Sequence, residues 1–107
     1  MNKIRGIREF TVAISEKLKK NNWDFTSVYS RMKGMTFTLN TKLQDQITEL
    51  NISQDAYKPE YFCQIALNKH LLTSLTFNKD VDDIEEYLNN LLTTLEKIRD
   101  CEIIVKK

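Results

Sequence analysis

Apolar residues recur with two different periods along this chain, and the change between the periods restricts the fold more than any other feature. Near both ends of the chain they follow one another at steps of three and four, as on one face of a helix. The first series is Ile4, Ile7, Phe10, Ile14 and Leu18, and the second is Val81, Ile84, Leu88, Leu91, Leu95 and Ile98. We therefore predict one helix over about 3–20 and a longer one over about 80–99, the second capped by Asn78 or Asp80.

Between the two helical segments the apolar period falls to two, which is typical of strands with one buried face. Residues 61–67 and 71–77 alternate in this way around Asn68-Lys69, so they predict a hairpin. The short apolar run 101–105 predicts a final strand after the second helix.

A first hairpin is predicted over residues 25–40, with a turn in which Gly34 can adopt a positive φ. Residues 41–52 fit either a helical face or a strand, and we favour a third strand because two hairpins alone make a small sheet. Residues 53–60 are predicted to form a loop, since they contain the only proline of the chain, Pro59.

This order of elements indicates the α+β class. Two amphipathic helices need a partner surface, and the apolar face of an antiparallel sheet provides one. We predict a two-layer sandwich in which about 4–6 antiparallel strands are covered on one face by an N-terminal helix and a long helix in the C-terminal half. The threonine-rich face of the sheet would stay in water. The length predicts a single α+β domain over residues 1–107.

Charge is nearly balanced, because 16 lysines and arginines oppose 15 aspartates and glutamates. The resulting net charge of +1 argues against a chain committed as a whole to nucleic acid or to an anionic membrane. No apolar run has the length of a signal peptide or a membrane span, so a cytoplasmic protein is expected. The basic residues are unevenly placed: residues 1–33 hold eight of them against three acidic residues.

Residues suited to catalysis or metal binding are scarce. Two glycines, two cysteines and one histidine are too few for a glycine-rich phosphate loop or for the four Cys or His ligands of a structural zinc site. Cys63 and Cys101 are expected to be reduced, and Cys63 to be a buried apolar residue rather than a disulfide or a reactive thiol. His70, beside the turn of the second hairpin, is predicted to be either satisfied by hydrogen bonds or exposed to solvent rather than to form a Cys63–His70 catalytic pair. We expect no enzymatic activity, no metal and no cofactor.

Four acidic residues gather at the predicted start of the second helix: Asp82, Asp83, Glu85 and Glu86. Acidic side chains stabilise a helix N-terminus, which is the simplest interpretation of this cluster. Its density also fits a contact surface for a partner protein, to which Tyr57 of the preceding loop would add an apolar contact.

A second candidate site is basic: Lys17, Lys19, Lys20 and Arg31. These residues could bind phosphates if they converge near Trp23, Phe25 and Tyr29, although we favour a solvated helix face as their explanation. A homodimer through the helix over 80–99 is a further possibility. However, its apolar repeat is shorter than the three to four heptads typical of a coiled coil.

The sequence therefore favours a non-enzymatic protein-binding protein. Small single-domain proteins of this kind from bacteria or phages often neutralise a partner by occluding its site, as immunity proteins, antitoxins and other inhibitors do. A nucleic-acid-binding or regulatory module that uses the basic N-terminal third is the alternative. An enzyme with a site built mostly from backbone atoms ranks third.

Overall fold

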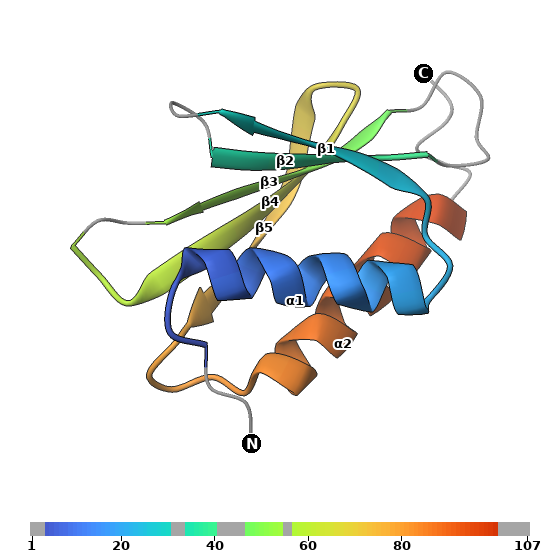
Figure 1. Cartoon of the computed structure of the whole chain (residues 1–107). Coiled ribbons are helices and arrows are strands. Elements are labelled where there is room, and N and C mark those ends of the chain that lie inside the picture. The colour runs from blue at the N-terminus through green and yellow to red at the C-terminus, as the bar shows by residue number, and fades with distance from the viewer. Residues whose placement is uncertain (1–3, 31–33, 41–46, 55–56, 101–107) are drawn as a thin grey trace.

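The structure is a computed structural model, and it describes residues 4–30, 34–40, 47–54 and 57–100. Its elements follow the order α-β-β-β-β-β-α: α1 (Ile7–Lys20), β1 (Phe25–Ser30), β2 (Gly34–Leu39), β3 (Thr48–Gln54), β4 (Glu60–Leu67), β5 (His70–Asn78) and α2 (Ile84–Asp100). The five strands form one antiparallel sheet in the order β1-β2-β3-β4-β5, and both helices lie on the same face of it (Figure 1). The predicted α+β, two-layer architecture is confirmed.

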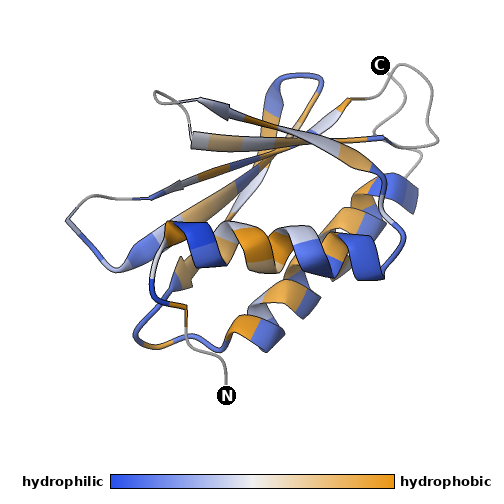
Figure 2. Ribbon diagram, viewed as in Figure 1, coloured by the Kyte–Doolittle hydropathy of each residue, from blue (hydrophilic) through white to orange (hydrophobic). Residues whose placement is uncertain are grey.

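The core fills the space between the inner face of the sheet and the two helices. Strand register places Phe37, Leu50 and Ile65 side by side on β2, β3 and β4, and all three are buried. The buried residues of α1 and α2 belong to the two helical stripes and pack against these strand residues. Figure 2 shows hydrophobic residues, in orange, on both helices and on the strands. Each fully buried side chain of this size contributes about 1.5–3 kcal/mol relative to an exposed one, so these stripes position both helices.

An aromatic cluster joins α1 and α2 to the β4–β5 hairpin. The ring of Phe10 lies 5.2 Å from that of Tyr61 and 5.4 Å from those of Phe77 and Tyr87. The hydroxyl of Tyr87 donates a 2.8 Å hydrogen bond to the carbonyl oxygen of Leu75, so a buried polar group is satisfied by the sheet.

The outer face of the sheet is polar, and no helix or strand of the described ranges covers it. One row across the five strands reads Val28, Thr36, Asn51, Gln64 and Ser74. The hydroxyl of Thr36 donates to the side-chain oxygen of Asn51 at 2.8 Å. The predicted threonine-rich, wet face is therefore present.

Helix ends differ from the predicted ones for local reasons. α1 begins at Ile7 rather than near residue 3, because Gly6 is extended and the chain enters the helix after it. It stops at the predicted asparagines: Asn22 has a φ of 65°, and the amide of Trp23 donates to the carbonyl of Leu18 at 3.0 Å. α2 begins at Ile84 rather than near residue 80.

The ambiguous segment 41–52 contributes a strand, as favoured, because residues 48–52 belong to β3. The remaining part of it, residues 41–46, lies outside the described residues, as does the predicted final strand 101–105. The predicted loop 53–60 is shorter than expected, since its two ends are the last residues of β3 and the first residue of β4. The bend of the second hairpin is confirmed: Asn68 and Lys69 both have positive φ, at 50° and 73°.

Candidate functional site

Two connections and the first turn of α2 meet at one end of the sheet and form the first candidate surface, which we call the loop end (residues 57–59 and 79–86). The first residue of β4 pairs with the last residue of β5, and just beyond them the amide of Lys79 donates to the carbonyl of Pro59 at 2.9 Å. Two large side chains of the loop end are strongly exposed, Tyr57 at 94% and Val81 at 78%. The fold thus brings the predicted Tyr57 to the same end of the molecule as the predicted acidic residues.

The β5–α2 connection is a tight turn held by its own side chains. The carbonyl of Asn78 accepts the amides of Val81 at 3.2 Å and Asp82 at 2.8 Å, while its side-chain oxygen accepts the amide of Asp80 at 2.9 Å. Asp82 closes the turn because its Oδ2 accepts the amide of Asn78 at 2.8 Å. Val81 was predicted to open the apolar stripe of the helix, and this is wrong: the turn holds it outside the helix, toward solvent.

Asp83 is the N-terminal cap of α2. Its Oδ2 accepts the amide of Glu86 at 3.0 Å, and its carbonyl accepts the amide of Tyr87 at 3.0 Å. The predicted caps, Asn78 and Asp80, are wrong because both residues belong to the preceding turn. Asp82 and Asp83 therefore have structural roles, which leaves Glu85 and Glu86, both exposed on the first turn of α2, as the acids with more freedom to meet a partner.

A groove beside the loop end runs between α1 and the start of α2. Its volume is about 640 Å³, and its apolar lining includes Val12, Ile84 and Leu88. Both basic and acidic side chains line it: Arg5, Arg8, Lys17 and Lys20 with Glu9, Glu16 and Glu85. Lys17 Nζ and Glu85 Oε1 are 3.9 Å apart across it. One residue of the basic cluster and one of the acidic cluster thus meet across the groove. An exposed pair of this length adds little stability.

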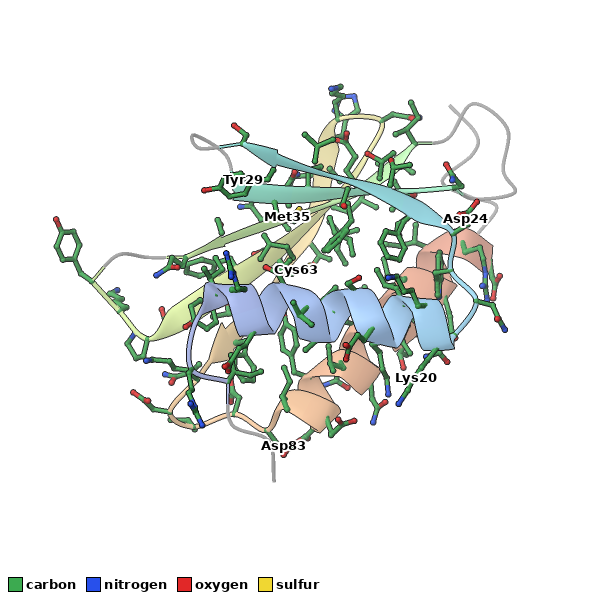
Figure 3. The ribbon with its side chains drawn as sticks, viewed as in Figure 1. Lys20, Asp24, Tyr29, Met35, Cys63 and Asp83 are labelled. Carbon is green, nitrogen blue, oxygen red and sulfur yellow. The ribbon has the colours of Figure 1, made fainter. Side chains whose placement is uncertain are left out.

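The basic face does not gather the aromatic rings that stacking on bases requires. Trp23 is buried, with the guanidinium carbon of Arg99 5.0 Å from its ring centre, and Phe25 packs edge-on against Phe37 at 5.2 Å. Tyr29 is exposed but lies four residues further along β1, about 13 Å from Phe25 by strand geometry. Figure 3 shows Tyr29 and Lys20 at well-separated places on the molecule. The predicted convergence is wrong for these rings.

Of the basic residues themselves, Lys19 and Lys20 are exposed on the last turn of α1, and Lys17 beside them is half-buried. The fourth predicted residue of this face, Arg31, lies outside the described residues.

Cys63 is fully buried on the inner face of β4, and burial raises the pKa of its thiol to about 12. The prediction of a buried apolar thiol is confirmed, while Cys101 lies outside the described residues. His70 is exposed and pairs with Leu67, four residues from Cys63, so about 13 Å of strand separates the two side chains. A Cys63–His70 pair is therefore not formed. Within the described part of the chain, no three His, Cys, Asp or Glu side chains group closely enough to hold a metal ion.

The apolar stripe of α2 is buried in the core of the protein. Tyr87, Leu88, Leu91, Leu92 and Leu95 are all buried. A homodimer through helix 80–99 would need this stripe at the surface, so the structure gives that interface no apolar basis. Neither described helix is long and apolar enough to cross a membrane.

Sequence inspection missed three features of this site: the exposure of Val81, the cap at Asp83 and the groove lined by Arg5 and Arg8. The cap had a readable signal, because an aspartate followed three residues later by a glutamate, as in Asp83 and Glu86, is a common start of a helix. The groove had none, since it depends on how two helices distant in sequence cross. Comparison of the chain with known protein families, with curated proteins and with solved structures finds no match.

Proposed function

We propose that this chain is a non-enzymatic protein-binding protein that uses the loop end to occlude a site on another protein, in the manner of a small bacterial or phage inhibitor, immunity protein or antitoxin. One observation carries the proposal. Tyr57 and Val81 project from two connections that a main-chain hydrogen bond joins, and both expose more than three quarters of their surface. A tyrosine that presents its ring to water gains most from burial in a partner's pocket.

The hydrogen bonds of the loop end support the same function. Four hydrogen bonds formed by Asn78 and Asp82 fix the turn, and the Lys79–Pro59 hydrogen bond fixes the other connection to it. A surface already held in shape loses little conformational entropy on binding, so more of the contact energy appears as affinity. The exposed carboxylates of Glu85 and Glu86 would orient a basic partner and speed its association. On this proposal the protein acts in the cytoplasm, with another protein as its partner and no cofactor.

Affinity capture from the native host with matched variants tests the proposal. The Glu85→Lys/Glu86→Lys double variant reverses two exposed charges without touching the turn or the cap, whereas reversing Asp82 and Asp83 would damage both. It also removes the exposed Lys17–Glu85 pair, which adds little stability, so the fold of the variant is checked by circular dichroism. Glu96→Lys is the control, because Glu96 is exposed further along α2. We expect one protein partner to be captured by the wild type and by the control, with clearly lower recovery on the double variant. Equal recovery on all three would show that the loop end is not the binding surface.

The alternative is a nucleic-acid-binding module, and Lys19 and Lys20 favour it because both are exposed on one helical turn. Phosphate contacts make affinity fall steeply with salt. Nucleic acid that copurifies at low salt and is lost from a Lys19→Glu/Lys20→Glu variant would support this function in place of the first.

A further inference from the structure

Among the described strands, β1 lies at one edge of the sheet. It pairs with β2 on one side, and no other strand of the described ranges lies beside it (Figure 1). Natural edge strands commonly carry a charge, a proline or a bulge that prevents pairing with another chain. β1 has none of these: its six residues read FTSVYS, and its register with β2 runs without interruption from Phe25 to Ser30.

The opposite edge strand is protected. β5 contains a register shift opposite the Ile65/Ala66 step, and such a bulge twists a strand and interrupts pairing. α2 also reaches β5, because the hydroxyl of Tyr87 occupies the carbonyl oxygen of Leu75. Of the two edges of the sheet, β1 is therefore the one open to a further strand.

The side chains beside this edge are exposed and uncharged. Thr26 and Ser27 are exposed, and Val28 and Tyr29 expose 64% and 68% of their surfaces. Val28 lies on the outer face of the sheet and Tyr29 on the inner face, since neighbouring residues of a strand alternate. A strand added to β1 would cover apolar surface on both faces at once.

We propose that the β1 strand of a second copy of this chain pairs with β1, antiparallel and centred on Ser27, so that two sheets join into one. A two-fold axis perpendicular to the sheet keeps the helices of both copies on the same face, and it requires odd-numbered residues to oppose odd-numbered ones. Centring the axis on Ser27 places Phe25 opposite the partner's Tyr29 and Thr26 opposite the partner's Val28. Aromatic and β-branched pairs of this kind are the favourable cross-strand contacts of antiparallel sheets.

The lack of charge in β1 points to a second copy as the occupant. In the symmetric pair centred on Ser27, the side chain of Ser27 meets its own copy at the axis, so a lysine or glutamate at that position would repel itself. None of the six residues of β1 carries a charge. The interface is small, so we expect a weak dimer whose population depends on protein concentration. The loop end lies on other connections, so this inference and the proposed function can fail independently.

Sedimentation of the purified full chain over a wide concentration range tests the inference. We expect the molar mass to rise from 12.6 kDa toward twice that value. Ser27→Lys and Ser27→Glu should each remain monomeric, because like charges meet at the axis, and an equimolar mixture of the two should form a mixed dimer. Ser74→Lys is the control: Ser74 is an exposed serine on the opposite edge strand, so this variant should dimerise like the wild type.

A disulfide provides a second measurement that fixes the register. The Cα atoms of residues directly opposed across antiparallel strands are about 4.5–5.5 Å apart, within the range a disulfide can bridge. Ser27→Cys in a Cys101→Ser background should therefore cross-link two copies on mild oxidation, whereas Ser74→Cys in the same background should not.

Two results would overturn the inference. One is a full chain that stays monomeric at all concentrations. If a chain ending at Asp100 then dimerises, residues 101–107 rather than a second copy occupy the edge in the full protein. The other is a Ser27→Lys variant that dimerises as well as the wild type, which would place the interface elsewhere.

Discussion

At the scale of single residues, Gly34 is a position where the backbone tolerates no side chain without strain. Its φ is +81°, and a Cβ added there would overlap the carbonyl oxygen of Ile52 on the neighbouring strand. Gly34→Ala should therefore destabilise the protein by about 1–3 kcal/mol, because both the left-handed conformation and the overlap are costly. Urea unfolding measures this loss.

Gly6→Ala is the matched control for that variant. Gly6 is extended, and no heavy atom lies within 4 Å of a Cβ built on it. The substitution should change the free energy of unfolding by less than about 1 kcal/mol, because alanine restricts the unfolded chain but caps α1 less well than glycine. Equal effects at Gly6 and Gly34 would contradict the close approach of β2 and β3 at Ile52.

Three buried side chains that ionise at high pH make the protein sensitive to alkali. Burial raises the pKa of Cys63 to about 12, and burial is also the main cause of the raised pKa values of Tyr61 and Tyr87. Above about pH 9 the unfolded thiol loses its proton while the folded one keeps it, so the free energy of unfolding falls as pH rises. One such group gives a slope of about 1.4 kcal/mol per pH unit.

Urea unfolding of the wild type and of Cys63→Ala at several values between pH 8 and pH 11 measures this slope. The variant should lack the fall between about pH 9 and pH 10 and show only the later one, which the tyrosines cause. A wild-type stability that stays constant up to pH 10 would mean that the Cys63 thiol is not held neutral in the folded protein.

At the scale of elements, the turn and cap before α2 decide where the long helix begins. Asp83→Ala removes the carboxylate that accepts the amide of Glu86, so it should cost about 0.5–2 kcal/mol of stability. Asp83→Asn should retain most of that stability, since asparagine caps nearly as well. Thermal unfolding of both variants distinguishes the contribution of the cap from that of the charge. Equal losses of stability in the two variants would show that the charge of Asp83, rather than its capping hydrogen bond, stabilises the helix.

Most elements could be predicted from the sequence because their apolar residues repeat with a clear period. The alternation around Asn68 and Lys69 predicts the β4–β5 hairpin correctly, and the steps of three and four predict α1 and α2. The first residues of α1 and α2 were predicted less well, because periodicity does not show where a preceding turn ends and the helix begins. Val81 fits the helical stripe by spacing alone, yet hydrogen bonds to Asn78 hold it in a turn.

At the scale of the whole molecule, the fold brings together charged residues that are far apart in the sequence. In sequence they suggest separate sites for a protein and for a nucleic acid. In the structure Lys17 and Glu85 lie 3.9 Å apart on the walls of one groove. Of the aromatic rings expected beside the lysines, Trp23 is buried in the core and Phe25 packs against it. Such a juxtaposition depends on the crossing of α1 over α2, which local patterns do not encode.

The same arrangement leaves the loop end as the surface where exposed apolar side chains and acidic residues occur together. The central claim is that Tyr57 there supplies binding energy to a partner protein. The most direct measurement is the dissociation constant of the captured partner for the wild type, Tyr57→Ala and the control Glu96→Lys, by titration calorimetry. Tyr57→Ala should weaken binding by about tenfold or more, as truncation of a buried interface tyrosine does, and the control should not change it. An unchanged dissociation constant for a folded Tyr57→Ala variant would contradict the claim.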